Sequence, residues 1–266
     1  MADSILSKKS VCVITGPTRG LGRSIANQLS QKLPDGSLFI LLSTNKALLD
    51  EVADVIMRRG EIRAVTHVFD QGSTNQDLFD TVIHDCLAEA AAEPSEFEQA
   101  ILVNNAGTLE PLELAKDLDN VSAINGHFST NLTGCVVLTA KFLQVFSAAV
   151  VNTRVIINIT SLAAILPMKS WLLYCMAKSS RDMMMKVIGE EESNIRTLNY
   201  APGPLDTDMM IIACKDTKDP ALRTWFQDQA KDNKLVKCDQ TVEKLITILE
   251  KNAFSNGAHI DYYDEA

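Results

Sequence analysis

The sequence predicts an α/β fold in which about seven parallel strands form one doubly wound sheet with helices on both faces. Short β-branched or apolar runs alternate with longer amphipathic segments from one end of the chain to the other. Such alternation is typical of a parallel sheet covered by its crossover helices. With 266 residues, of which 46% are hydrophobic and 22% charged, the chain can also bury a large core. We therefore expect a single domain spanning residues 1–266.

Strands are expected where β-branched and apolar residues cluster between turn-forming residues. In chain order they are residues 11–16, 38–43, 64–70, 101–107, 154–161, 195–203 and 258–263. Between them, apolar residues recur at three- and four-residue spacing, which predicts helices. Clear examples are residues 23–33, 47–60 and 178–192. No repeat, low-complexity tract or flexible linker marks a second domain.

One connection is longer than the others. Residues 203–238 stand between the sixth strand and the last helix, where an ordinary connection has only a few residues. A long insertion at this point predicts a segment that covers a substrate.

The first strand, turn and helix carry a nucleotide-binding pattern. The segment VCVITGPTRGLGRSIANQL (11–29) spaces Gly16, Gly20 and Gly22 as T-G-x-x-x-G-x-G. Glycines allow the backbone to approach a pyrophosphate, and the N-terminus of the following helix offers N–H groups and the positive end of a dipole. The strand before the turn and the helix after it predict a Rossmann-type cofactor site. Thr18, Arg19 and Leu21, within the same turn, are expected to contact the cofactor.

Two further turns are expected at the cofactor. Asp70 and Gln71 end the third strand, where the carboxylate can meet an adenine amino group; a helix cap is the alternative role for Asp70. The motif NNAG (104–107) closes the fourth strand, with a plain turn as its alternative role. From it we assign Asn104, Ala106 and Gly107 to the cofactor site.

The end of the second strand favours NADPH over NADH. An NAD site usually places an acid there to hold the ribose 2′-hydroxyl, and LLSTNKA (41–47) contains none. Arg19 and Lys46 can supply positive charge to a 2′-phosphate, and Thr44 and Asn45 can donate hydrogen bonds. The predicted cofactor is therefore NADPH/NADP+.

Ser161, Tyr174 and Lys178 form a candidate catalytic set within residues 160–178. Lys178 follows Tyr174 by four residues, so the two side chains share a helix face. A tyrosine pKa of about 10 is high for proton transfer at neutral pH, and a nearby ammonium is expected to lower it. Ser161 ends the fifth strand, at the sheet edge where ligands of open α/β folds bind. A lone Tyr-x-x-x-Lys pair would normally be a surface pair, but this serine and the glycine turn together indicate catalysis.

These motifs resemble those of the short-chain dehydrogenase/reductase family: TGxxxGxG at 15–22, NNAG at 104–107, Ser161, Tyr174-x-x-x-Lys178 and APG at 201–203. The resemblance covers nearly the whole chain and implies an oxidoreductase. It implies that Tyr174 donates a proton, Ser161 holds the carbonyl, and Lys178 tunes the tyrosine and holds the nicotinamide ribose. Asn131, in NLTG, would complete the set through a proton-relay water.

The resemblance also implies cofactor contacts from Pro202, Leu205, Thr207 and Met209.

The ending GAHIDYYDEA (257–266) resembles that of family members that reduce side-chain carbonyls of pterins. If all strands are parallel, Asp261 lies on the same sheet edge as Ser161. A carboxylate can accept two parallel hydrogen bonds from the adjacent amino and ring N–H groups of a pterin. We therefore expect Asp261 to anchor a pterin substrate, with Gly203 also in contact; a solvated tail is the alternative.

Two positions depart from the resemblance. Met168 stands where an aromatic residue is expected, which bears on the fit of the substrate. The second strand lacks the arginine expected to meet the 2′-phosphate, which bears on the strength of cofactor binding.

Other classes of function are disfavoured by composition. The formal net charge of −9 argues against a nucleic-acid partner. No secretion signal or stretch of eighteen charge-free apolar residues predicts a membrane segment, so we expect a cytoplasmic protein. The six cysteines lack C-x-x-C spacing, and no metal site is expected. The family resemblance suggests a homodimer built on the long helices after the fourth and fifth strands.

Two alternative functions remain at this point. A short-chain reductase for another ketone would need no acid to anchor a ring. A non-catalytic NADPH-sensing protein is the other, and such proteins often lose the tyrosine or the lysine that this chain retains.

Overall fold

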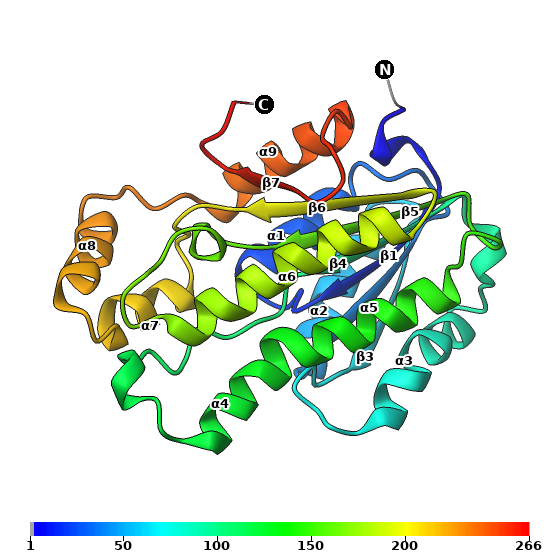
Figure 1. Cartoon of the computed structure of the whole chain (residues 1–266). Helices are drawn as coiled ribbons and strands as arrows, with labels where there is room; N and C mark the ends of the chain where they lie inside the picture. Colours follow the sequence, from blue (N-terminus) through cyan, green and yellow to red (C-terminus); the bar gives the residue numbers. More distant parts are fainter. Residues whose placement is uncertain (1–2, 266) are drawn as a thin grey trace.

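The central feature of the structure, a computed structural model that describes residues 3–265, is a fully parallel sheet (Figure 1). Its strands lie in the order β3-β2-β1-β4-β5-β6-β7. They span β1 (Ser10–Thr15), β2 (Leu38–Ser43), β3 (Arg63–Val68), β4 (Gln99–Asn104), β5 (Thr153–Ile159), β6 (Ile195–Ala201) and β7 (Ala258–Asp261). The prediction of a doubly wound sheet of about seven parallel strands is confirmed.

Helices cover both faces of this sheet. Apolar side chains of α1 (Gly20–Leu29), α2 (Lys46–Met57) and α9 (Cys238–Lys251) pack against one face. Those of α3 (Gln76–Glu89), α5 (Gly134–Val145) and α6 (Leu172–Glu191) pack against the other, which is the near face in Figure 1. The central strands are buried on both sides, which explains why they are almost continuously apolar in sequence. Before α5, α4 (Val121–Phe128) passes into a short π-helical segment, Ser129–Thr133.

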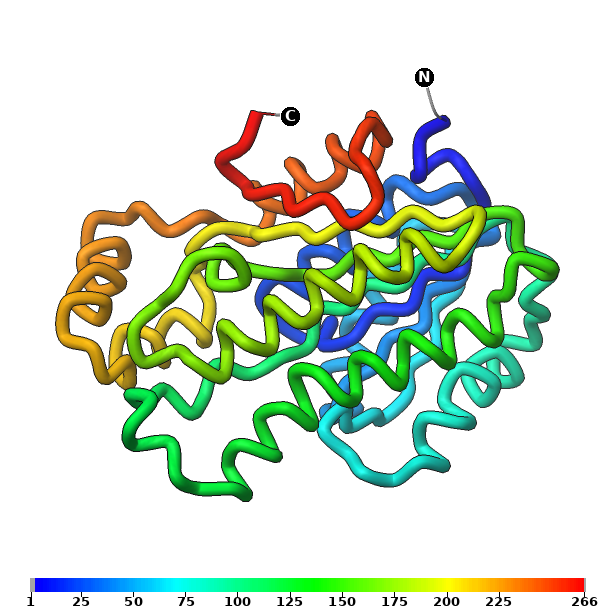
Figure 2. Tube along the Cα trace, in the orientation of Figure 1, coloured from blue at the N-terminus to red at the C-terminus, as the bar shows by residue number. Residues whose placement is uncertain are grey.

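Two further helices lie beyond the carboxyl ends of the strands. The chain leaves β6 and forms α7 (Asp208–Asp216) and α8 (Pro220–Lys231) before it returns as α9, a path that Figure 2 shows as a continuous yellow-to-orange tube. Leu205 and Val236 pair in a short parallel bridge and so hold the two ends of the excursion together. Trp171, just before α6, stacks on Phe226 of α8 with ring centres 5.0 Å apart. These helices therefore pack directly beside the start of α6.

Within residues 3–265, no helix has the length and apolar character needed to span a bilayer.

Candidate active site

The glycine-rich turn between β1 and α1 has a backbone that requires its glycines. Gly16 and Gly20 have φ angles of +66° and +50°, which side-chain-bearing residues rarely adopt. A Cβ on Gly22 would collide with the carbonyl oxygen of Gly16. The side chain of Asn105 donates hydrogen bonds to the carbonyl oxygens of Thr15 (2.9 Å) and Gly16. Asn105 therefore fixes the turn, a role that the sequence analysis missed although it lies within NNAG.

The N-terminus of α1 is suited to an anionic ligand. No side chain caps the N-terminus of α1 after Arg19, and the same holds for α6 and α7. Uncapped N–H groups beside a tight glycine turn are the donor set that a pyrophosphate needs. A Cβ on Gly20 would lie 3.3 Å from the methyl group of Thr207, so the segment after β6 borders the turn. The residues present thus fit a dinucleotide cofactor.

Three of the four side chains expected at a 2′-phosphate are engaged in different ways. Lys46 contacts Asp50 at 2.6 Å and Thr66 at 2.7 Å. Asn45 caps α2 by accepting a hydrogen bond from the Leu48 N–H. Arg19 is 74% exposed and pairs with Asp208 at 2.6 Å. Arg19 lies on the rim of the glycine turn itself, whereas Lys46 is held by Asp50 of its own helix and by Thr66 of β3.

The expected adenine-side residues divide into exposed and buried ones. Asp70 is exposed, and its Oδ1 accepts a hydrogen bond from the Gly72 N–H at 2.9 Å. It does not cap α3, because Asn75 does so. Gln71 is buried and donates to the Thr130 carbonyl at 2.7 Å. Asn104 is also buried and donates to Thr139 at 3.0 Å, so both amides point into the protein.

The predicted catalytic side chains come together at the carboxyl edge of β5. Ser161 follows β5, and its Oγ accepts a hydrogen bond from the Ala163 N–H at 3.2 Å, which leaves its own O–H free to donate. A hydrogen bond also links Ser161 with Tyr174. On α6, Lys178 Nζ lies 5.4 Å from the centre of the Tyr174 ring and donates to the Ile159 carbonyl at 2.7 Å. The arrangement can hold a carbonyl oxygen between two hydroxyl groups.

The lowered pKa expected for Tyr174 is wrong in direction. Burial raises the pKa of Tyr174 to about 12, outweighing the opposing effects of Arg181 and of the hydrogen bond with Ser161. Burial, and then the charge of Arg181, lowers the pKa of Lys178 well below its ordinary value. The desolvation that the sequence pattern did not reveal therefore keeps the phenol protonated. A neutral phenol is the form that can donate a proton to a carbonyl.

Asn131 lies in the π-helical segment before α5 and is buried. Its amide accepts a hydrogen bond from the Thr108 N–H at 2.9 Å and donates to the Thr108 carbonyl at 3.0 Å. A Cβ on Gly107 would lie only 2.7 Å from its Oδ1, so the glycine allows this close approach. The side chain thus fastens the loop after β4 to the helix; the proton-relay role of Asn131 stays a prediction.

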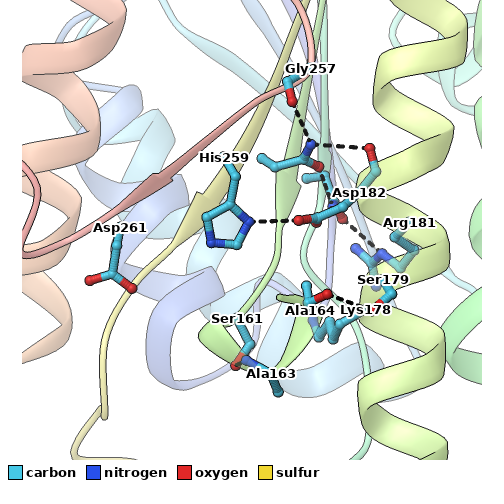
Figure 3. A network of polar contacts seen from close by, with 12 residues as sticks. Ser161, Ala163, Ala164, Lys178, Ser179, Arg181, Asp182, Gly257, His259 and Asp261 are labelled. Carbon is cyan, nitrogen blue, oxygen red and sulfur yellow. Dashed lines mark hydrogen bonds and ion pairs between the residues drawn. The ribbon is translucent and has the colours of Figure 1, made fainter. Parts of the chain in front are cut away.

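The strand register places Asp261 near the level of Ser161. Asp261 of β7 pairs with Ala201 of β6. One residue earlier in β6, Tyr200 pairs with Ile159 of β5. Asp261 is therefore level with the residue just before Ser161, at a distance of about 10 Å given a spacing of about 4.8 Å between strands. Figure 3 shows both side chains on the same side of the sheet edge. The Asp261 carboxylate is half-buried and accepts a hydrogen bond from the Tyr263 N–H at 3.0 Å.

Arg181, which was not predicted from the sequence, has a fully buried side chain whose charge acts on Lys178. Its guanidinium donates to the side chain of Asn158 at 2.7 Å and to the carbonyls of Asn104 and Ala106. It thereby ties α6 to the NNAG turn. The position of Arg181, three residues after Lys178 on the same helix, was the available signal.

Comparison with known proteins agrees with this geometry. The family model described as short chain dehydrogenase matches residues 10–217. Sepiapterin reductase of Rattus norvegicus is 34% identical over 259 residues, which is 96% of this chain and 97% of the relative. Sepiapterin reductase of Meriones unguiculatus is 36% identical with the same coverage. A benzil reductase of Bacillus subtilis is 28% identical, covering 94% of this chain and 96% of that protein.

Solved structures share the fold. The KRED1-Pglu enzyme matches with a TM-score of 0.79 and 21% identity over 94% of this chain and all of that one. A short-chain dehydrogenase of Shigella flexneri complexed with NADP matches with a TM-score of 0.77 and 18% identity, over 98% of this chain and 100% of that one.

Proposed function

The chain belongs to the short-chain dehydrogenase family, and from that membership we propose that it reduces the side-chain carbonyls of pterins with NADPH. It is an oxidoreductase that uses a nicotinamide cofactor. The reactions are conversion of sepiapterin to dihydrobiopterin and of 6-pyruvoyl-tetrahydropterin to tetrahydrobiopterin, in tetrahydrobiopterin biosynthesis. The observation that carries the proposal is a carboxylate, Asp261, one residue from the level of Ser161 in a chain similar to sepiapterin reductases along nearly its whole length.

The cofactor is held by the glycine turn, the start of α1 and the segment after β6. The N–H groups of Gly20, Leu21 and Gly22 would bind the pyrophosphate. Thr207 borders them from the other side. Lys178 would hold the nicotinamide ribose. When bound, NADPH supplies the hydride.

Proton transfer uses the hydroxyl pair at the edge of β5. Ser161 donates a hydrogen bond to the substrate carbonyl oxygen, which orients and polarises it. Tyr174, kept neutral by burial, donates its proton to the same oxygen as charge develops there. Trp171 contacts the Tyr174 ring edge-on at 5.6 Å and, with Phe226 stacked behind it, holds the phenol in place.

The pterin ring extends from Ser161 toward Asp261. A span of about 10 Å, two strand spacings, suits a two-ring heterocycle whose short side chain reaches the hydroxyl pair. Asp261 accepts the amino and ring N–H hydrogen bonds. Gly203 has a φ of +79°, and a Cβ there would lie within 4 Å of Tyr262 and Tyr263. The glycine thus leaves room where the insertion (203–238) and the C-terminal segment meet.

A second candidate is reduction of another ketone, which the similarity to benzil reductases favours. Such a substrate would use Ser161, Tyr174 and Lys178 but would gain nothing from Asp261. Comparison of sepiapterin with a small diketone separates the two functions. The assembled catalytic set disfavours a non-catalytic NADPH sensor.

The active form is a cytoplasmic homodimer. Apolar side chains of α5 and α6 are exposed: Val136, Met176, Met183 and Val187. A second copy packed on these helices would cover them. All six cysteines are free thiols, which suits a reducing compartment.

We expect Arg19→Ala to weaken NADPH binding about ten- to a hundred-fold, because a charged hydrogen bond to phosphate contributes about 1.5–3 kcal/mol. The exposed pair of Arg19 with Asp208 competes with it by only about 0.2–1 kcal/mol. NADH, which lacks the phosphate, should bind almost unchanged. Titration of intrinsic fluorescence with each cofactor measures both constants.

Arg23→Ala is the matched control for this prediction. Arg23 lies one turn further along α1 and pairs with Glu51 at 3.4 Å, so its loss should affect neither cofactor. Equal weakening of NADPH and NADH by Arg19→Ala would show that Arg19 only shapes the turn.

A further inference from the structure

A row of polar side chains crosses the carboxyl half of the sheet. Asn104 of β4 pairs in register with Asn158 of β5, Asn158 with Asn199 of β6, and Asn199 with His259 of β7. Residues in register on parallel strands point to the same face, and this row faces α6. We call these four residues the polar row. Its members lie far apart in sequence, and only the strand register brings them together.

Hydrogen bonds hold the two middle members of the polar row, Asn158 and Asn199. Asn158 donates to Asn199 at 2.7 Å, and Asn199 donates to the Gly257 carbonyl at 3.2 Å, just before β7. Arg181 donates to Asn158 from α6. Burying amides costs free energy unless they are paired, and an aliphatic row would fill the same space. The row therefore suggests a requirement for defined geometry.

The outer end of the polar row is fastened to the catalytic helix. His259 Nδ1 donates to the Asp182 carboxylate at 2.6 Å, as Figure 3 shows. Their side chains are only 14% and 8% exposed, and His259 Nε2 is buried without a partner among the described residues. A short bond in this setting holds β7 firmly against α6.

Each partner of this bond lies on the same element as one of the groups that the proposed reaction uses. Asp182 follows Lys178 by four residues and Tyr174 by eight, so the three share one face of α6. His259 precedes Asp261 by two residues, so these two side chains leave the same face of β7. The Asp182–His259 bond thus joins α6, which carries Tyr174, to β7, which carries Asp261.

We propose that His259, held by Asp182, is a positioning residue that sets the placement of Asp261 relative to Tyr174 and so determines selectivity for pterins over small ketones. The inference rests on the proposed function, because it requires Asp261 to bind the substrate ring. β7 is short, pairs on one side only with β6, and is half-buried along its length. Such an edge strand needs a fastening to α6 if a carboxylate near its end is to meet two ring donors at once.

The test compares sepiapterin with butane-2,3-dione as substrates of the full chain with NADPH. We expect His259→Phe, which keeps a ring but removes the donor, to lower kcat/KM for sepiapterin about 10- to 100-fold, since a misplacement of about 1 Å can cost that much. The diketone, which does not reach Asp261, should keep its kcat/KM. His259→Asn, whose amide nitrogen takes nearly the place of Nδ1, should restore much of the pterin activity.

Two further comparisons separate positioning from loss of stability. Ile260→Val loosens the same strand on its opposite face, where Ile260 packs against the other core, and should leave the ratio of the two substrates unchanged. In an Asp261→Asn background, His259→Phe should cause little additional loss, because its effect passes through Asp261. If His259→Phe is too unstable to purify, His259→Gln, which shifts the donor by one methylene, should give the same selective loss.

Equal losses for both substrates, fully additive losses with Asp261→Asn, or no loss at all would each overturn the proposal. Wild-type protein that reduces the diketone but not sepiapterin would instead overturn the proposed function, and the inference with it. That outcome is recognised before any variant is made.

Discussion

Replacing Tyr174 with phenylalanine should lower kcat for sepiapterin by about 10²- to 10⁴-fold, the usual contribution of a general acid. The substitution keeps the ring that packs edge-on against Trp171 and removes only the donated proton. Since burial raises the pKa of Tyr174 to about 12, the phenol is protonated across the neutral range and no other state needs to be formed first. Single-turnover kinetics with bound NADPH measure the chemical step, and fluorescence titration should show cofactor binding unchanged.

Tyr200→Phe is the matched control. Tyr200 is also fully buried, but its hydroxyl bonds to Thr241 on the other face of the sheet. Its loss should reduce stability and spare kcat. Substantial turnover by Tyr174→Phe would mean that the proton comes from another group. Ser161→Ala should be milder than Tyr174→Phe, because Tyr174 can still polarise the carbonyl.

Asp261→Asn should lower kcat/KM for sepiapterin about a hundred-fold or more, while butane-2,3-dione is spared. The amide matches the carboxylate in shape, but it carries no charge and presents a donor to one of the ring donors. Loss of a matched charged acceptor costs about 2–3 kcal/mol or more. The amide oxygen can still accept from the Tyr263 N–H, so the turn after β7 should persist. Steady-state kinetics with both substrates measure the effect.

Asp264→Asn controls for disturbance of the C-terminal segment. Asp264 accepts a hydrogen bond from the Asp261 N–H at 2.8 Å and belongs to the same turn. The substitution should change kcat/KM little for either substrate. If Asp261→Asn harms both substrates equally, Asp261 is structural, and if it harms neither, the carboxylate has no role at the pterin.

The parts of the site that rest on local patterns were predictable from sequence. Tyr174 and Lys178 share a helix face because they are four residues apart. The turn at Gly16 needs glycine because its φ angle is positive. The parallel sheet followed from the alternation of apolar runs and amphipathic segments, and it placed Ser161 and Asp261 on one edge. The third strand was expected to reach residue 70 but ends at Val68, because Asp70 turns the chain back onto Gly72.

Properties that depend on burial or on strand register were not predictable in this way. The raised pKa of Tyr174 reflects desolvation by residues from several elements. Asn158 stands in an otherwise apolar run of the fifth strand, and its place beside Asn199 emerges from the pairing of β5 with β6. The pairing of Lys46 with Asp50 is a local i, i+4 contact, and it could have been expected to compete with a phosphate.

The central claim is that this chain is an NADPH-dependent pterin reductase, and consumption of NADPH with sepiapterin tests it most directly. The assay follows cofactor absorbance with sepiapterin, set beside NADH in place of NADPH and beside butane-2,3-dione in place of sepiapterin. We expect kcat/KM to be highest for sepiapterin with NADPH and to fall clearly when either is replaced. Reduction of the diketone without any reduction of sepiapterin would contradict it.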